Sequence, residues 1–386
     1  MKKKIAILGS TGSIGKTLVE IIKKDKKKFD IVLLTADKNY KEILKQTKYF
    51  NVKNLIITNE KSFRELKKKK LGKINIFNNY NSFNNIFKKR IDYVMSSISG
   101  IDGLEPTLKI IKHTKKIAIA NKEAIICGWH LIKKDLRKYK TKFVPVDSEH
   151  FSINYSINDI NLNHIESIYL TASGGPLKDL PLNKFKNIKV SDALKHPNWK
   201  MGKKISIDSA TMMNKVFEII EAHKIFNIPY KKLKILVHPK SYVHAIVKFN
   251  DGMIKVIAHD TNMKIPIHNS IYSPEIKSLK TKKIDINRLN NLNFTNVNYK
   301  KFPLVRIISK LSEINSLYET VIVATNDELV KKFLQKKINY QDISKKMYKF
   351  ITSKKFIKYK HIKAKSVDKI IELNNYVRFK INNISI

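Results

Sequence analysis

The chain has 386 residues, of which 42% are hydrophobic and 9% aromatic, enough for a large core and for about two or three domains. This composition excludes a disordered tail protein and a mini-protein held by cross-links. Lys and Arg number 77 against 32 acidic residues, and the resulting formal charge of +45 favours a nucleic-acid-binding protein at first sight.

The kind of basic residue argues against that interpretation. Only 6 of the 77 basic residues are Arg, whereas readout of bases and phosphates favours the bidentate guanidinium. Lys, Ile and Asn are inflated together along the whole chain, as in a compositional drift. We therefore expect most Lys side chains to form a solvated surface and no nucleic-acid partner, and we keep a basic nucleic-acid-binding protein as an alternative.

The single cysteine, Cys127, excludes a disulfide framework and a thiolate metal cluster, and it fits a reducing compartment. The basic start is followed by four apolar residues and then Gly9, too short a run for a signal peptide. No segment approaches the roughly 20 apolar residues of a membrane span. We therefore expect a cytoplasmic protein without a membrane partner.

Up to about residue 146, short β-branched runs alternate with amphipathic stretches. This alternation predicts an α/β domain with a Rossmann-like, doubly wound parallel sheet over residues 1–147. The expected strands are 5–8, 31–34, 55–58, 93–98, 117–120 and 143–146.

The remainder of the chain has a different pattern. Residues 148–274 predict a central α+β catalytic domain, because the strand-like runs 168–171, 235–238 and 243–249 flank a helical pattern near 210–226. Residues 275–300 are polar and without period, which indicates a connecting segment. Segments 304–314 and 327–335 indicate helices, so residues 301–386 are expected to form a small helical domain.

Gly9, Gly12 and Gly15 lie between the first expected strand and a helical pattern. Glycines at this spacing let the backbone approach a pyrophosphate, and the free amides near Ser13 and Ile14 direct partial positive charge at it. A plain tight β–α turn is the alternative. The glycine-rich loop follows the first strand of an alternating pattern, and this position favours the nucleotide-binding interpretation.

The residue that selects between NAD and NADP is expected about 20 residues further on, after the second strand. Asp37 there suits a ribose 2′-hydroxyl and NAD, whereas Lys38 and Asn39 suit a 2′-phosphate and NADP. Asp37 also suits the start of a turn. The residues alone leave the choice open.

Asp147 and Glu149 follow the sixth expected strand. In an extended segment residues i and i+2 point to the same side, so the two carboxylates would lie together. A hard cation such as Mg²⁺ or Mn²⁺ removes their repulsion and prefers oxygen ligands. A helix cap or a solvated turn is an equal alternative. His150 is ambiguous, because one histidine makes no zinc site.

A third ligand is expected downstream, where Ser209 or Thr211 can cap a helix. Asn214, Lys215 and Glu218 fall within one arc of that helix, opposite its apolar residues. Hydroxyl, amide, ammonium and carboxylate groups within ten residues suit a phosphate beside a metal, although a solvated helix face is the alternative.

Two loops suit the same site. Residues 171–176 follow an apolar strand, and their glycines expose amides near Ser173, as an anion cradle requires. Residues 193–203 place His196, Trp199 and Met201 between a proline and a glycine. We expect this segment to be a flexible flap that covers substrate, with a plain surface loop as the alternative.

Taken together, these motifs resemble the 1-deoxy-D-xylulose 5-phosphate reductoisomerase family, in order and over nearly the whole chain. The resemblance is strongest over 92–270 and weakest around 60–90 and in the C-terminal helical region. The residues that carry it are 9–15, Ala-Asn-Lys-Glu at 120–123, Pro-Val-Asp-Ser-Glu-His at 145–150, Ser-Gly-Gly-Pro at 173–176, His-Pro-Asn-Trp at 196–199, and 204–215.

The resemblance implies a homodimeric enzyme of isoprenoid biosynthesis. Such an enzyme rearranges 1-deoxy-D-xylulose 5-phosphate and reduces the product with NADPH to 2-C-methyl-D-erythritol 4-phosphate, with Mg²⁺ or Mn²⁺ as a second cofactor. The implied metal ligands are Asp147, Glu149 and Glu218, which with Lys122 form the implied catalytic set. The implied substrate contacts are Lys122, Ser148, Glu149, Ser173, His196, Ser209, Asn214 and Lys215. The implied NADPH contacts are Thr11, Gly12, Ser13, Ile14, Lys38, Asn39, Asn121, Glu123 and Gly202, with Asp37 beside them. Trp199 and Met201 would belong to the flap.

One residue departs from the family pattern, because members carry Gly where this chain has Asp37. Its carboxylate would repel a 2′-phosphate, yet we expect NADPH to be preferred, with Lys38 compensating. Another NAD(P)-dependent dehydrogenase remains an alternative function. A short-chain dehydrogenase is disfavoured, because Tyr49 and Lys53 have its Tyr-x-x-x-Lys spacing but follow the second strand, too early in the sheet.

Overall fold

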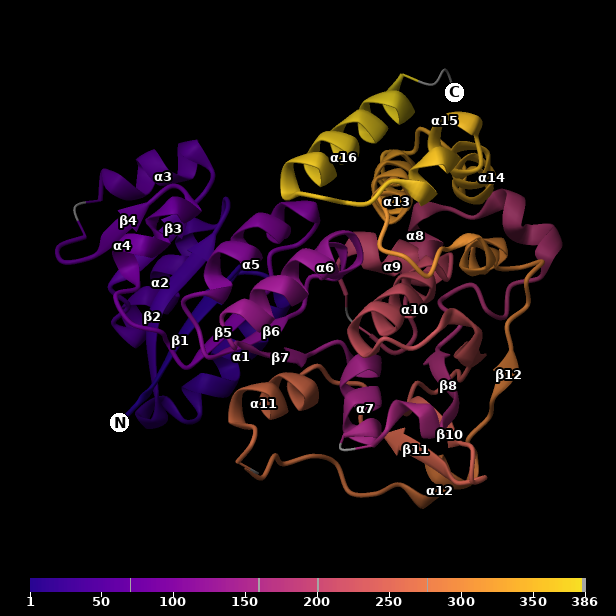
Figure 1. Cartoon of the computed structure of the whole chain (residues 1–386), viewed down its shortest axis with the longest axis horizontal. Helices are drawn as coiled ribbons and strands as arrows, with labels where there is room; N and C mark the ends of the chain where they lie inside the picture. Colours follow the sequence, from indigo (N-terminus) through magenta and orange to yellow (C-terminus); the bar gives the residue numbers. More distant parts are fainter. Residues whose placement is uncertain (70, 159, 200, 276, 384–386) are drawn as a thin grey trace. The chain divides into compact units, whose positions relative to one another are not determined.

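The computed structural model describes residues 1–69, 71–158, 160–199, 201–275 and 277–383 (Figure 1). Contacts between Cα atoms divide the chain into two compact units. Unit 1 comprises 1–125, 129–147 and 263–280, and unit 2 comprises 126–128, 148–262 and 281–386. The sequence-based division into three domains and a connecting segment remains a prediction. The two-unit grouping differs from it by placing 263–280 in unit 1 and 126–128 in unit 2.

Unit 1 contains a seven-stranded, wholly parallel sheet in the order β4-β3-β2-β1-β5-β6-β7. The predicted doubly wound sheet is confirmed, because the strand order reverses direction at β1, with β2 on one side and β5 on the other. The strands are β1 (Lys3–Leu8), β2 (Phe29–Ala36), β3 (Asn54–Ile57), β4 (Asn75–Phe77), β5 (Tyr93–Ser96), β6 (Lys116–Ile119) and β7 (Lys142–Pro145).

The sequence missed β4, because it has three residues and lies in a Lys-rich stretch without alternation. The strands that were predicted are buried. Ile5, Ile7 and Leu34, for example, are fully inaccessible, and each such side chain contributes about 1.5–3 kcal/mol of hydrophobic stabilisation. Burial on both faces explains why these strands appear as continuous apolar runs.

Unit 1 also contains α11, which the sequence-based division places in the central domain. This helix packs against α1, and Ser270 on α11 hydrogen-bonds with the Tyr93 hydroxyl over 2.7 Å. The helices of unit 1 are α1 (Ser13–Lys23), α2 (Tyr40–Phe50), α3 (Glu60–Lys67), α4 (Phe83–Ile86), α5 (Leu104–Ile111), α6 (Lys122–Lys138, whose residues 126–128 are grouped with unit 2) and α11 (Lys264–Tyr272).

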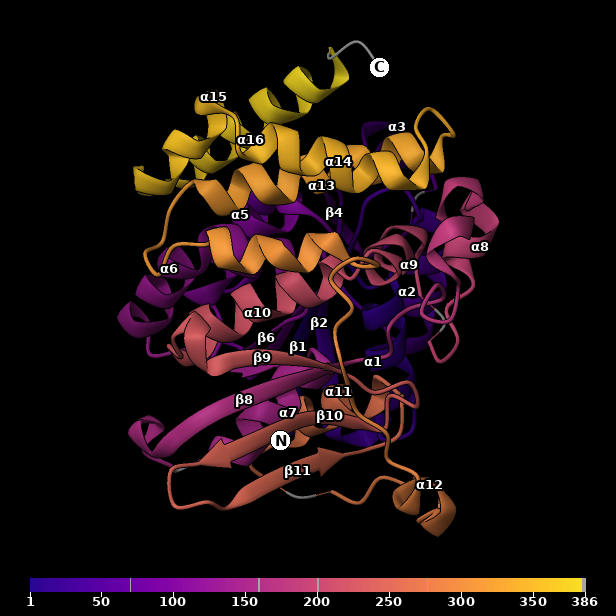
Figure 2. The same ribbon diagram turned by 90° about the vertical axis from the view of Figure 1, so that its right-hand side faces the viewer.

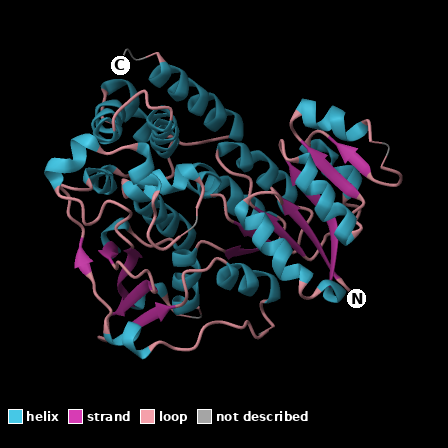
Figure 3. Ribbon diagram, turned by 180° about the vertical axis from the view of Figure 1, so that it is seen from behind, coloured by secondary structure: helices cyan, strands magenta, loops and turns pink. Residues whose placement is uncertain are grey.

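Unit 2 contains a second sheet, in the order β11-β10-β8-β9-β12. Figure 2 shows β11, β10, β8 and β9 side by side, and Figure 3 shows strands in magenta. Only β8 and β9 are parallel. The sequence missed β11, because three of its first four side chains are exposed. The strands are β8 (Ile165–Ala172), β9 (Leu233–Val237), β10 (Val243–Phe249), β11 (Ile254–Ala258) and β12 (Thr295–Asn296).

The predicted helix near 210–226 is confirmed as α10, which begins at Met213 because Met212 directly before it adopts a left-handed conformation with φ of 61°. The predicted helix over 304–314 is instead a 3₁₀ helix, Pro303–Lys310, whereas 327–335 falls mostly within α13. The helices of unit 2 are α7 (Ser148–Ile157), α8 (Val190–Leu194), α9 (Lys203–Ala210), α10 (Met213–Phe226), α12 (Ile286–Asn290), α13 (Tyr318–Leu334), α14 (Tyr340–Ile351), α15 (Lys354–Ile357) and α16 (Val367–Asn382).

The helical C-terminal region is organised by α13, which packs against α14 and α16. A charged network also connects α13 to α9. Asp208 of α9 accepts a hydrogen bond of 2.7 Å from Asn326, and Lys204 bridges Asp208 and Asp327 at 3.0 and 3.1 Å. In the part of the chain that the structure describes, no helix has the length and apolar character that crossing a bilayer requires.

Candidate active site

The glycine-rich loop joins β1 to α1 at the point where the strand order reverses. Gly9 has φ of +80°, a conformation that side chains disfavour. A Cβ on Gly15 would lie 2.5 Å from the Gly9 carbonyl oxygen, so only glycine allows α1 to begin this close to the loop. Gly12 is the residue before the helix, and the amides of Ser13 and Ile14 are therefore in its first turn. The loop has the form of a phosphate-binding turn.

Asp37 and Asn39 lie between β2 and α2. The exposed Asp37 carboxylate accepts a 3.1 Å hydrogen bond from Thr58, a contact that the sequence analysis missed because Thr58 follows a different strand. Asn39 caps α2 by accepting from the Glu42 amide at 3.2 Å. The carboxylate is thus held at the end of β2, where a ribose is bound in this fold.

Asn121 connects α6 to the loop after β5. Its side-chain oxygen caps the helix by accepting from the Ala124 amide at 2.6 Å, and its amide donates to the carbonyls of Gly100, at 2.6 Å, and Ile98. Gly103 lies against this amide, where a Cβ would clash at 2.3 Å. Asn121 therefore fixes the backbone from which Lys122 and Glu123 extend.

Asp147, Glu149 and Glu218 converge. One carboxylate oxygen from each lies within 4.8 Å of the others. The convergence of Asp147 and Glu149 was predicted for the wrong reason, because Glu149 lies in the first turn of α7 and not in an extended segment. Asp147 is the residue directly before that helix, and its carboxylate lies 3.6 Å from the Lys122 ammonium.

Positive charge is already accommodated among these carboxylates. The Lys215 ammonium lies 3.1 Å from Glu149 and also pairs with Glu218, which accepts a further hydrogen bond from Asn214. Burial raises the pKa of Glu149, but Lys215 and the nearby His244 outweigh burial and hold that pKa well below its ordinary value of 4.5. Carboxylate oxygens from three residues, in surroundings that stabilise positive charge, fit a hard divalent cation.

The polar arc of α10 is not a solvated helix face. Lys215 and Glu218 are only 4% and 2% exposed, and the apolar residues of the opposite arc are equally buried. An ammonium and a carboxylate are rarely buried to this extent unless they are paired. The sequence-based alternative of a solvated face is therefore wrong.

The loop after β8 places the Ser173 hydroxyl against His196 and lies beside the Ser209 backbone. A Cβ on Gly175 would lie 2.6 Å from the Ser209 carbonyl oxygen, so the loop packs directly against α9. His196 Nδ1 accepts from the amides of Asn198 and Trp199, so Nε2 carries the proton and donates to the Ser173 hydroxyl at 3.1 Å. Burial lowers the pKa of His196 to about 4, which keeps the imidazole neutral at pH 7.

The predicted flap, 193–203, runs from the end of α8 to the start of α9, and residue 200 lies outside the described residues. Asn198 holds it by donating to the Pro239 carbonyl at 2.7 Å and to Ser241 at 2.9 Å. The Trp199 indole is half-buried, and its edge packs against the His244 ring with centroids 6.4 Å apart. Met201 and Gly202 directly precede α9.

His244 and His259 were missed by the sequence analysis. His244 lies in β10, in a run that the sequence analysis treated only as an apolar strand, and its Nδ1 is 3.9 Å from Glu149. His259 follows β11, which was not predicted. Neither residue belongs to a recognisable spacing, so no signal in the sequence pointed to them.

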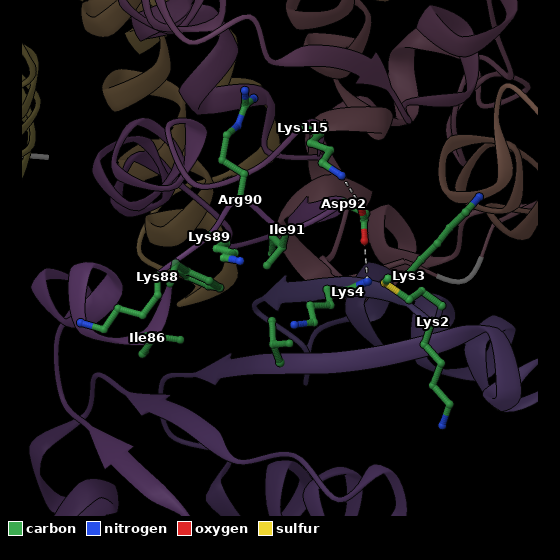
Figure 4. Close-up of a pocket in the computed structure, with 13 residues that line it drawn as sticks. Lys2, Lys3, Lys4, Ile86, Lys88, Lys89, Arg90, Ile91, Asp92 and Lys115 are labelled. Carbon is green, nitrogen blue, oxygen red and sulfur yellow. Dashed lines mark hydrogen bonds and ion pairs between the residues drawn. The ribbon is translucent and has the colours of Figure 1, made fainter.

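A basic cavity of about 600 Å³ lies in unit 1, away from the glycine-rich loop (Figure 4). It is lined at the amino end of β1 by residues 1–4 and further along the chain by 86–92, whereas the glycine-rich loop follows the carboxyl end of β1. Two basic side chains on its wall have local partners, since Lys115 pairs with Asp92 and Arg90 binds the Thr114 carbonyl. None of the predicted site residues lines it.

A turn of the phosphate-binding form at the first crossover of a parallel sheet, together with a carboxylate cluster paired with Lys215, is typical of a dinucleotide-dependent oxidoreductase with a divalent-metal site. Family models agree over three segments: the 1-deoxy-D-xylulose 5-phosphate reductoisomerase model matches residues 5–128, and two models of its C-terminal domains match 143–226 and 260–380. The chain belongs to the 1-deoxy-D-xylulose 5-phosphate reductoisomerase family.

Individual relatives support this assignment. The chain is 59% identical over 387 residues to the 1-deoxy-D-xylulose 5-phosphate reductoisomerase of Pelagibacter ubique, with 100% of both chains covered. It is 37% identical to that of Sulfurihydrogenibium sp., covering 95% of this chain and 94% of the relative. The solved Zymomonas mobilis enzyme in complex with NADPH superposes with a TM-score of 0.89 at 30% identity, covering 98% of each chain. A further solved reductoisomerase, in complex with NADPH, fosmidomycin and magnesium, has a TM-score of 0.89 at 28% identity, covering 98% of this chain and 97% of that chain.

Proposed function

We propose that the protein converts 1-deoxy-D-xylulose 5-phosphate to 2-C-methyl-D-erythritol 4-phosphate with NADPH and a divalent cation. The observation that carries this proposal is the convergence of Asp147, Glu149 and Glu218 around a stabilised positive charge. When bound, the cation supplies Lewis-acid polarisation of substrate oxygens, and NADPH supplies the hydride.

The chain's own residues divide between two ends of the substrate. Asp147, Glu149 and Glu218 would hold the cation at the end where bonds change, with Lys122 beside Asp147 and Ser148 donating to Glu149. Ser173, Ser209, Asn214 and Lys215 would bind the phosphate, because hydroxyl, amide and ammonium groups are its natural donors. Binding energy from the remote phosphate would position the reacting atoms.

His196 would contribute a neutral imidazole at this site. Its Nε2 proton is directed at the Ser173 hydroxyl, which also accepts from the Gly175 amide. The Ser173 hydroxyl hydrogen is then left to point towards an acceptor such as a phosphate oxygen. Trp199 and Met201 would cover the substrate and exclude water.

The cofactor would lie along the carboxyl edge of the sheet in unit 1. Thr11, Gly12, Ser13 and Ile14 would contact the pyrophosphate through the loop and the start of α1. Asp37, Lys38 and Asn39 would surround the adenosine ribose. Because Asn121 already uses its side chain to cap α6, it would contact the cofactor through its backbone. Glu123, two residues further on, would be a further contact. Gly202 would contact the cofactor from the flap.

An assay of NADPH loss on addition of 1-deoxy-D-xylulose 5-phosphate tests the proposal. We expect oxidation only with substrate, abolition by a chelator, and recovery on addition of Mg²⁺ or Mn²⁺. A rate of NADPH oxidation that is unchanged by the chelator would exclude the metal-dependent reaction. Tight, salt-sensitive nucleic-acid binding without NADPH oxidation would favour the basic-protein alternative.

The oligomeric state and the location in the cell are also proposals. The family resemblance supports a homodimer, which light scattering at micromolar concentration would detect as twice the chain mass of 44.9 kDa. The single buried Cys127 supports a reducing, cytoplasmic location. Cell fractionation would check that location.

A further inference from the structure

The ring of His259 stacks on the ring of His244 in unit 2. Their centroids are 3.8 Å apart and their planes are inclined by 17°. The pairing of Val243 with Ala258 in β10 and β11 brings the two histidines together. His244 Nε2 also donates to the His259 backbone carbonyl at 3.2 Å, so His259 holds the same ring by one face and one nitrogen.

His244 contacts two parts of the proposed active site. Its second nitrogen, Nδ1, lies 3.9 Å from a carboxylate oxygen of Glu149, and Trp199 of the flap packs edge-on against the ring. Phe151, two residues after Glu149 on α7, packs edge-on against the His259 ring, with centroids 6.0 Å apart. The flap and the start of α7 are therefore joined by a continuous row of four rings.

We propose that His259 is a positioning residue that holds His244 between the flap and Glu149, and so couples docking of Trp199 to the orientation of a metal ligand. This inference rests on the proposed function, because it assigns a regulatory contact to the same site. None of the four rings supplies a metal ligand in the proposed set.

The coupling follows from the geometry of the His244 side chain. A hydrogen bond at Nε2 alone leaves the ring free to rock about that bond, whereas the stacked His259 ring blocks movement out of its plane. With both restraints, Nδ1 stays directed at Glu149. Groups that orient a metal ligand from outside its coordination sphere alter metal affinity by about 10- to 100-fold. By linkage, flap docking and cation binding must then strengthen each other by the same factor.

The test uses the full chain carrying Trp129→Phe, so that Trp199 is its one remaining tryptophan. His259→Ala removes the stacked ring and keeps the backbone carbonyl, and His259→Phe restores a ring of similar area. His223→Ala is a matched control, because His223 stacks on Tyr230 with centroids 4.1 Å apart and has no place in the proposed site. Mn²⁺ affinity is measured from free Mn²⁺ by electron paramagnetic resonance, and flap docking from acrylamide quenching of Trp199.

We expect His259→Ala to weaken Mn²⁺ binding about tenfold and to increase Trp199 quenching. His259→Phe should recover most of both properties, and His223→Ala should change neither. The double variant of His259→Ala and Trp199→Ala should lose less Mn²⁺ affinity than the product of the two single fold-losses, because both substitutions act through His244.

Unchanged Mn²⁺ affinity in His259→Ala would overturn the proposal. An equal loss of Mn²⁺ affinity in His259→Ala and His259→Phe would also overturn it. So would a double variant, His259→Ala with Trp199→Ala, whose loss of Mn²⁺ affinity equals the product of the two single losses. These measurements need no turnover. If the protein does not oxidise NADPH with the substrate but His259→Ala still weakens Mn²⁺ binding, the proposed function alone is rejected. If the protein is active but His259→Ala leaves Mn²⁺ binding unchanged, the positioning role alone is rejected.

Discussion

His150 Nε2 donates to the backbone carbonyl of Glu218 at 2.9 Å, and this bond ties the first turn of α7 to the turn of α10 that carries the third carboxylate. His150 is 1% exposed, so the bond is shielded from water. The bond thus joins two helices 68 residues apart along the chain, close to the carboxylates of Glu149 and Glu218.

Replacing His150 by Ala should therefore weaken Mg²⁺ activation, because the turn bearing Glu218 loses its link to α7. We expect the Mg²⁺ concentration for half-maximal activity to rise about tenfold. NADPH affinity, measured by fluorescence titration, should stay unchanged. An unaltered Mg²⁺ requirement would show that α10 is positioned by other contacts.

Glu218→Gln should reduce turnover about 100-fold or more, since it removes one anionic ligand while keeping the side-chain shape. Cofactor affinity should change far less, because the proposed cofactor contacts do not include α10. Steady-state kinetics and NADPH titration separate the two effects. Wild-type turnover in this variant would remove Glu218 from the metal site.

Gly15→Ala should destabilise unit 1 and weaken NADPH binding, because the added Cβ meets the Gly9 carbonyl oxygen at 2.5 Å. Overpacking of this kind costs about 1–3 kcal/mol. Thermal unfolding and NADPH titration measure the two effects. An Ala variant with unaltered stability and affinity would mean that the loop is not held this tightly.

Asp37→Gly should increase the preference for NADPH over NADH. Two like charges about 4 Å apart in water repel by about 1 kcal/mol, so the expected gain in the kcat/KM ratio is about fivefold. The wild-type protein should still prefer NADPH. Comparable kcat/KM with both cofactors in the wild type would refute that expectation, and an unchanged ratio in the variant would place Asp37 away from the 2′-phosphate.

Stability should fall as the pH drops from about 6.5 to about 4. Burial lowers the pKa of His196 to about 4, and burial followed by the charge of His244 lowers the pKa of His259 to about 4, from an ordinary value of 6.5. Within this window the unfolded chain binds protons that the folded chain does not, so stability is fully present above the window and is lost within it. Thermal unfolding between pH 4 and 8 measures the slope, which His196→Asn should reduce. If stability in His196→Asn depends on pH as steeply as in the wild type, His196 does not contribute to the loss of stability at low pH.

Much of the fold was predictable because its signals are local. The buried strands of unit 1 appear as apolar runs, and the Gly9 to Gly15 spacing marks the first crossover wherever the later strands lie. Short or exposed elements carry no such signal. β4 and β11 were therefore missed, and the helix over 304–314 was assigned the wrong type.

By itself, the sequence determined the fold class, the family and the residue types of the site, because these depend on periodicity and on motifs of neighbouring residues. Only the tertiary structure decided which side chains meet. Glu149 and Lys215 are 66 positions apart along the chain, and no periodicity relates the row of rings from Trp199 to Phe151. Such contacts arise from the packing of whole helices and strands, which a local pattern in the chain does not encode.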